Sequence, residues 1–183
     1  MIRRAAVVAM LITGCRNVAK TPAASDGSVP AVIGGAAPGQ FVDLAPGDTA
    51  GVIAMMRQVM RGIDAGLVAM TRRDTSFAAA ADSVARHLTV WLQDAVPRKL
   101  VVIDSMGQAQ NNIETDVWFM GGDVVVMLQV ADAFAFDADR IVLWTDEALQ
   151  PRIDATPDAL MAKQGVLIET VRGWLQRFKI ALP

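Results

Sequence analysis

The feature of this sequence that most constrains its fold is a change in hydrophobic period at Leu88. Between Val52 and Met70, apolar residues recur at the spacing of one helix face. From Leu88 to about residue 145, apolar and polar residues alternate as they do in β-strands. Turn residues divide this second stretch into segments that leave no room for a helical crossover, so neighbouring segments must pair antiparallel. The sequence therefore predicts an antiparallel β-meander of about five to six strands.

The expected strands cover residues 88–93, 99–105, 114–120, 124–130, 133–137 and 140–145. Between them, turns are predicted at residues 94–98 with Pro97, at 107–112, at Gly121-Gly122 and at 137–139, where Gly, Pro, Asn and Asp concentrate. Residues 71–87 follow neither period. Within them, residues 77–86 fit either a short helix or a loop.

An amphipathic helix is predicted on each side of the meander. The first begins near Asp48 or Thr49, either of which can cap it, and its apolar face consists of Val52, Ile53, Met56, Val59, Met60, Ile63, Leu67 and Met70. The last helix has Thr156 as its cap and Pro157 at its first position, and its face consists of Leu160, Gln164, Leu167, Ile168, Val171, Leu175 and Phe178. Residues 46–183 are thus expected to form a single α+β domain.

Strand alternation predicts two unlike faces of the sheet. One set of side chains, such as Leu88 and Val90, is mainly aliphatic, and we expect both helices to cover it. The other set places Trp91, Trp118 and Trp144 among polar neighbours. If the register aligns them, the three Trp residues form a candidate binding surface. The alternative is that they fill a second core beneath the linker, residues 71–87 or a helix.

The first residues of the chain have the layout of a secretory signal. Arg3 and Arg4 precede the apolar run 5–12, and small residues lead to Cys15, which is the only cysteine. A membrane-spanning helix needs roughly 20 apolar residues, which is far more than this run contains. We expect residues 1–14 to be a signal peptide that is removed.

The segment Ile12-Thr13-Gly14-Cys15 resembles the lipobox of bacterial lipoproteins, with Ile in place of the usual Leu three positions before the cysteine. The resemblance covers residues 1–15 only. It implies that Cys15 is acylated and becomes the first residue of a protein anchored to a membrane of the cell envelope. Arg16, rather than Asp, follows the cysteine, which by the same resemblance favours the outer membrane, facing the periplasm. Residues 15–45 are rich in Pro, Gly and small side chains, so we expect a lipidated N-terminus and flexible linker.

Residues that could carry chemistry are few. His87 is the only histidine. A zinc site would therefore lack His and Cys ligands, and a Ser-His-Asp arrangement would have to use His87. Asp104 and Asp116 could face each other across strands and perform acid–base work. The net charge of −2 and the scattered basic residues give no reason to expect nucleic acid. The sequence predicts no catalytic residue, metal or cofactor.

Three hypotheses of function follow. The first is a non-enzymatic, lipid-anchored envelope protein that acts as a binding or assembly module. The second is a periplasmic carrier that holds an apolar ligand between the sheet and a helix. The third is a hydrolase that uses paired carboxylates.

The anchor is directly testable. Cys15→Ala removes the thiol that would be acylated, so the variant is expected to remain unlipidated and to be uncleaved or mislocalised. Membrane fractionation together with mass spectrometry of the N-terminal peptide measures both effects. Normal fractionation of the variant with membranes would contradict the lipobox assignment.

Overall fold

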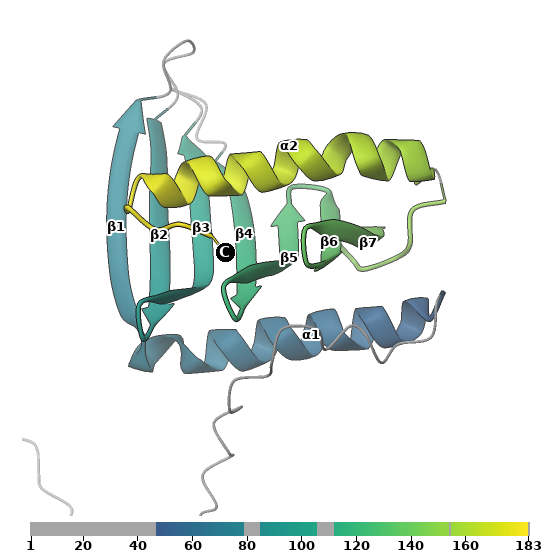
Figure 1. Cartoon of the computed structure of the whole chain (residues 1–183), viewed down its shortest axis with the longest axis horizontal. Helices are drawn as coiled ribbons and strands as arrows, with labels where there is room; N and C mark the ends of the chain where they lie inside the picture. The colour runs from purple at the N-terminus through teal and green to yellow at the C-terminus, as the bar shows by residue number, and fades with distance from the viewer. Residues whose placement is uncertain (1–46, 79–84, 106–111, 154, 183) are drawn as a thin grey trace, which may run out of the picture. The chain divides into compact units, whose positions relative to one another are not determined.

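A computed structural model describes residues 47–78, 85–105, 112–153 and 155–182. Two α-helices, α1 (Thr49–Gly66) and α2 (Pro157–Gln176), flank one antiparallel sheet, and a short 3₁₀ turn, η1 (Leu67–Ala69), follows α1. The strands pair in chain order (Figure 1): β1 (Thr71–Ala78), β2 (Ala85–Gln93), β3 (Val96–Ser105), β4 (Asn112–Met120), β5 (Asp123–Gln129), β6 (Asp132–Asp137) and β7 (Arg140–Asp146). The predicted α+β meander between two helices is confirmed. The signal, Cys15, the linker and most of the turn at 107–112 lie outside the described residues.

The sheet has seven strands rather than the five to six expected, because β1 was not predicted. Phe77 and Ala78 end β1, and Ala85 begins β2, so both alternatives for residues 77–86, a short helix or a loop, were wrong at these positions. Most side chains of β1 are exposed on both faces, and three consecutive residues, Arg72 to Asp74, are charged. Edge strands commonly carry such charges. They hide the alternation by which strands are recognised in a sequence.

Short turns set the register of the meander. Asp94 and Ala95 alone join β2 to β3, with φ of 53° and 66°. Gly121 and Gly122, also with positive φ, join β4 to β5 in the same way. Two-residue hairpins favour such conformations because their twist matches that of the strands. The first turn is shorter than the predicted 94–98, since Pro97 already lies in β3 opposite Leu92.

Both helices begin where the sequence predicted. The backbone N–H of Gly51 donates to the Asp48 carboxylate at 2.9 Å, and that of Ala159 donates to the Thr156 hydroxyl at 3.2 Å. The predicted apolar faces are the faces that pack on the sheet. The prediction for α2 omitted Trp174, which is also buried in the core.

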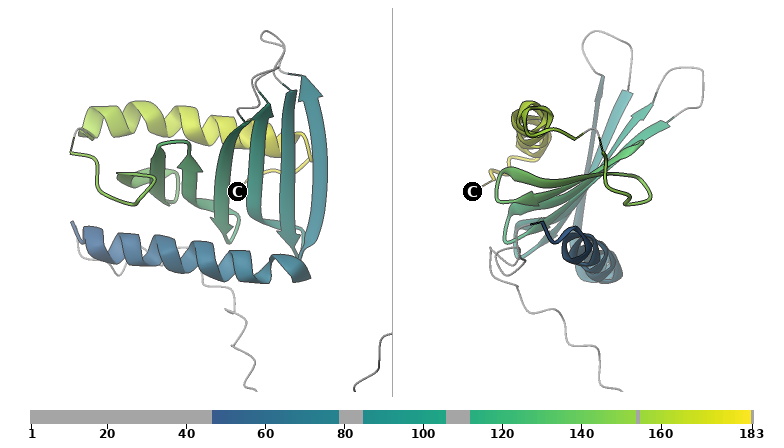
Figure 2. Two further views of the ribbon diagram at one scale, coloured as in Figure 1. Left: turned by 180° about the vertical axis from the view of Figure 1, so that it is seen from behind. Right: turned by 90° about the vertical axis from the view of Figure 1, so that its right-hand side faces the viewer.

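The helices cover opposite faces of the sheet (Figure 2, right), so the prediction that both cover one face was wrong. The core beneath α2 contains the aliphatic residues of β2 and β3 together with Phe119, Phe134 and Phe136. A second core beneath α1 includes Trp118, Val126 and Ala135. Strands β4 to β6 are therefore apolar on both sides. Each of their faces needs its own cover, since exposed apolar surface is unfavourable.

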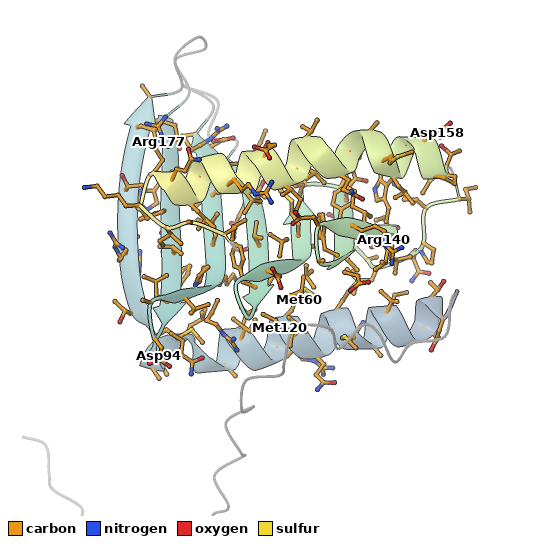
Figure 3. The ribbon with its side chains drawn as sticks, viewed as in Figure 1. Met60, Asp94, Met120, Arg140, Asp158 and Arg177 are labelled. Carbon is orange, nitrogen blue, oxygen red and sulfur yellow. The ribbon has the colours of Figure 1, made fainter. Side chains whose placement is uncertain are left out.

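The second core includes methionines as well as branched side chains. Met56 of α1 is fully buried, and Met60 and Met120, labelled in Figure 3, pack at the edge of the same cluster between α1 and β4. Unbranched Met side chains suit an irregular gap of this kind. The fit of α1 to the sheet thus depends on flexible side chains.

Met56→Ala tests whether α1 is an integral part of the fold. Removal of a fully buried Met side chain is expected to lower the free energy of unfolding by about 2–5 kcal/mol. The matched control is Gln58→Ala, an exposed position on the same helix, for which the change is expected to stay within about 0.5 kcal/mol. Urea unfolding followed by circular dichroism measures both values. Equal effects at the two positions would show that α1 does not pack as described.

Candidate functional site

Helix α1 covers only one end of strands β1 to β4 on its side of the sheet (Figure 2, left). No described helix or strand covers the rest of that side, which we call the open face. Its residues follow from strand register and alternation: Arg72, Asp74, Ser76, His87, Trp91, Val101, Ile103, Glu114 and Asp116. The open face is mainly polar, with half-buried apolar side chains near its middle.

Register places two of the three predicted Trp residues on the α1 side of the sheet. Trp91 pairs with Lys99, and Lys99 pairs with Trp118, so the three side chains form one row across β2, β3 and β4. Trp118 is a core residue: it is only 4% exposed, and its indole N–H donates to Asp64 of α1 at 3.0 Å. Lys99 donates to the same carboxylate at 3.0 Å. Asp64 thereby ties the end of α1 to the row.

Trp144 lies on the other side of the sheet, so the prediction that all three Trp residues could align is wrong. From Trp118 the register runs through Val126 and Ala135 to Leu143, which takes the place expected for Trp144. Trp144 packs instead against Phe134 beneath α2, with ring centroids 5.6 Å apart. Strand alternation defines faces only within one strand, and register decides which faces coincide.

Charged side chains hold Trp144 in place. Its indole N–H donates to Asp132 at 2.8 Å, and Lys163 of α2 lies over its ring at 4.6 Å. Arg152 also contacts both the ring and the Asp132 carboxylate. Burial acts to raise the pKa of Asp132, but the hydrogen bonds from Trp144 and Arg152 outweigh it, so the pKa lies below its ordinary value. These contacts give Trp144 a structural role: it packs between the sheet and α2.

Of the three Trp residues predicted to form a binding surface, Trp91 lies on the open face. It is half-buried, and the Arg72 guanidinium lies over its ring at 5.6 Å. Arg72 is itself held by Asp74, with the closest nitrogen–oxygen distance 2.8 Å. The Arg72 guanidinium therefore covers one face of this half-buried ring at the surface, and aromatic side chains of this kind are common in interfaces.

A hydrogen-bond network surrounds His87 on the open face. Its Nδ1 lies 2.7 Å from the Ser76 hydroxyl, and its Nε2 lies 3.5 Å from Asp74 Oδ1. Thr89 donates to the same Asp74 oxygen at 2.7 Å. Hydrogen bonds from Arg72 and then Thr89 lower the pKa of Asp74 below its ordinary value.

Ser76, His87 and Asp74 are the residue types of a hydrolytic triad, and their proximity could not be read from the sequence because β1 was not predicted. In a triad, the carboxylate orients the imidazole through a close hydrogen bond. Here Arg72 and Thr89 occupy the Asp74 oxygen at shorter distances than His87 does. We therefore interpret these residues as a surface network that joins β1 to β2.

The predicted pair Asp104 and Asp116 does not form. Asp104 is aligned with Ile113 and Asp116 with Val101, and the two carboxylates lie on opposite sides of the sheet. Asp104 forms a two-pronged ion pair with Arg86, with a second nitrogen–oxygen distance of 2.8 Å. The carboxylate of Asp104 thus joins β3 to β2 through an ion pair and does not face Asp116.

Asp116 is a half-buried carboxylate of the open face. Burial raises the pKa of Asp116 above its ordinary value, the positive charge of Lys99 opposes this, and the negative charge of Glu114 adds to it. The Asp116 Oδ1 atom lies 3.4 Å from Lys99 Nζ, and Lys99 makes a closer contact with Asp64. The charged form of Asp116 is thus incompletely compensated.

Within the described ranges, no group of three or more His, Cys, Asp or Glu side chains is placed to hold a metal ion. Among the described helices, none is both long enough and apolar enough to cross a membrane. No protein-family model, curated protein or solved structure matches this chain. The open face and the N-terminal sequence are therefore the features of this chain that bear on its function.

Asp116→Asn is expected to stabilise the protein at neutral pH. Because the pKa of Asp116 is raised in the folded state, its ionisation disfavours folding, and the penalty is fully present above the folded pKa. As the pH falls through the raised pKa towards 3.8, wild-type Asp116 becomes protonated and the advantage of the variant disappears. Thermal unfolding as a function of pH measures the difference. Asp104→Asn, which breaks the ion pair with Arg86, is the control and should destabilise; an equal loss in both variants would contradict the assignment.

Proposed function

We propose that this protein is a lipid-anchored binding module of the cell envelope and that the open face contacts its protein partner. The anchor is the predicted lipidated Cys15, and the predicted linker 15–45 would hold the domain away from the bilayer. Arg16 favours the outer membrane, facing the periplasm, by resemblance to other lipoproteins. The proposed partner is another envelope protein.

The observation that carries the proposal is the composition of the open face. Trp91, Val101 and Ile103 are half-buried, and they lie on neighbouring strands. Charged and hydroxyl side chains surround them, including Asp74, Ser76 and Glu114. Protein interfaces commonly combine a small apolar or aromatic centre with a polar rim. No described helix covers this surface, whereas the two apolar cores of the sheet lie beneath α2 and α1.

The packing favours a binding module over a carrier of an apolar ligand. A carrier would hold its ligand between the sheet and a helix. The space between the sheet and α2 contains the fully buried side chains of Phe119, Phe134, Phe136 and Leu175, and Met56 fills the corresponding position beneath α1. A carrier function would require these side chains to separate, at a cost in buried apolar area.

Ile103→Asp tests the proposed contact surface. A charge at the centre of the open face should leave the fold intact, because Ile103 is only half-buried, and should weaken partner binding by about tenfold or more. The measurement is in-cell cross-linking of the full chain from a photoreactive residue at position 101, followed by quantification of the cross-linked envelope protein.

The matched control is Val166→Asp, because Val166 is an apolar residue on α2 that is 64% exposed and lies away from the open face. It should leave cross-linking unchanged. Undiminished cross-linking of Ile103→Asp would place the contact elsewhere, and loss of cross-linking in both variants would point to a general defect and count against the open face.

A further inference from the structure

The two edges of the sheet differ in how their backbone groups are used. At β7, the chain that follows the strand folds back along its outer edge: the N–H of Arg152 donates to the carbonyl of Trp144 at 3.0 Å, and the N–H of Asp146 donates to that of Gln150 at 2.9 Å. Thr145 forms a β-bridge with Pro151 on the same side. The molecule therefore pairs the C-terminal part of this edge with its own chain.

The edge at β1 is different. β1 pairs with β2 on one side, and no described strand pairs with its other side (Figure 1). It is a full strand of eight residues without a proline, so alternate residues direct outward N–H and C=O groups that no described strand pairs with. An edge of this kind can accept an additional strand.

Two exposed guanidinium groups lie beside this edge on the α2 side of the sheet. Arg73 lies over the ring of Phe178 at 5.9 Å, and Arg177 lies over the ring of Phe77 at 4.4 Å. Figure 3 shows Arg177 at the end of α2 nearest β1. Among the described residues, neither arginine has an acidic partner, whereas Arg72, Arg86 and Arg172 each have one.

We propose that β1 is the docking edge for an extended acidic segment of a partner protein, which adds to the sheet as a further strand. Its backbone would pair with the outer edge of β1, and carboxylates on one of its faces would meet Arg73 and Arg177. Side chains on its other face would lie beside Asp74 and should be uncharged, since a carboxylate there would be repelled. This inference names the partner class of the proposed binding module and therefore rests on that function.

A second copy of the same chain satisfies this edge less well. In a two-fold antiparallel pairing of two β1 strands, residues that oppose each other lie on the same face of the combined sheet. On the α2 side, β1 presents Thr71, Arg73, Thr75 and Phe77. None of these is acidic, so a second β1 strand would leave both arginines without a partner. An acidic segment compensates them directly.

The test is a titration of the full chain, purified in detergent, with a synthetic peptide as long as β1 in which Glu and Thr alternate. Binding is measured by isothermal calorimetry, and hydrogen exchange reports where the peptide lies. We expect saturable binding that weakens as salt increases, with new protection of the β1 amides. Arg73→Glu and Arg177→Glu should each weaken binding by about tenfold or more. The matched control is Arg57→Glu, an exposed position on α1, which should bind normally.

Three control peptides separate the contributions: one with Lys in place of Glu, one with its Glu residues in a single block, and one with every backbone nitrogen methylated. All three should bind at least about tenfold more weakly. Equal binding of the methylated peptide, binding without protection of β1, or a stable dimer of the full chain that excludes the peptide would each overturn the inference. Failure of the peptide while Ile103→Asp still abolishes cellular cross-linking would overturn the acidic-strand inference and leave the proposed function standing.

Discussion

Burial of the aliphatic side of the sheet beneath α2 is the interaction on which the rest of the structure depends. Phe119, Phe134 and Phe136 come from β4 and β6, and they are fully buried with Val171 and Leu175 of α2. Burial of each large apolar side chain contributes roughly 1.5–3 kcal/mol. A slip of one residue in any pair of strands would move such side chains to the other face, so this core also fixes the register of the meander. The two-residue turns at Asp94-Ala95 and Gly121-Gly122 fit that register without additional chain.

The other side of the sheet is divided, and that division creates the candidate site. Where β4 to β6 are apolar on this side, α1 packs on them through Met56, Val59 and Ile63. Where β1 and β2 carry polar side chains, a hydrogen-bonded network around Asp74 and His87 replaces helix packing. Polar groups at a surface can satisfy one another and water, so they need no cover. Asp64 lies at the boundary between the part of the sheet that α1 covers and the open face. Near the end of α1, its carboxylate accepts hydrogen bonds from Lys99 and Trp118 of the sheet.

The two edges of the sheet are protected from unwanted strand pairing in different ways. The chain after β7 pairs with its outer edge, which leaves that edge little capacity to recruit another strand. At β1, no described segment pairs with the outer edge. The charged side chains of Arg72, Arg73 and Asp74 instead discourage pairing with strands of other molecules. The same charges can select a partner of complementary charge, since electrostatic complementarity contributes chiefly to specificity and association rate. The proposed acidic segment would thus interact with charges of the same strand that discourage pairing with other strands.

The sequence by itself determined the elements that depend on local spacing. The alternation from Leu88 onward, the turn residues, and the caps Asp48 and Thr156 identified six strands and two helices, because helix and strand periods and capping bonds involve neighbours along the chain. The buried faces of both helices followed from the same periodicity. The sequence alone also supports the prediction that Cys15 is lipidated, because the lipobox and the signal before it consist of consecutive residues.

Only the tertiary structure decided which surfaces those elements share. Strand β1 was not predicted, because its exposed edge position allows charged residues where a central strand would have apolar ones, and the alternation of apolar and polar residues is therefore missing. Irregular pairing at Trp91/Leu92, Trp118/Phe119 and Ala135/Phe136 shifts the register, so Trp144 faces α2 while Trp91 and Trp118 face the other way. The choice of opposite faces by the two helices depends on how much apolar surface each face presents once all seven strands are paired. These outcomes depend on contacts between residues far apart in the chain, which no local pattern specifies.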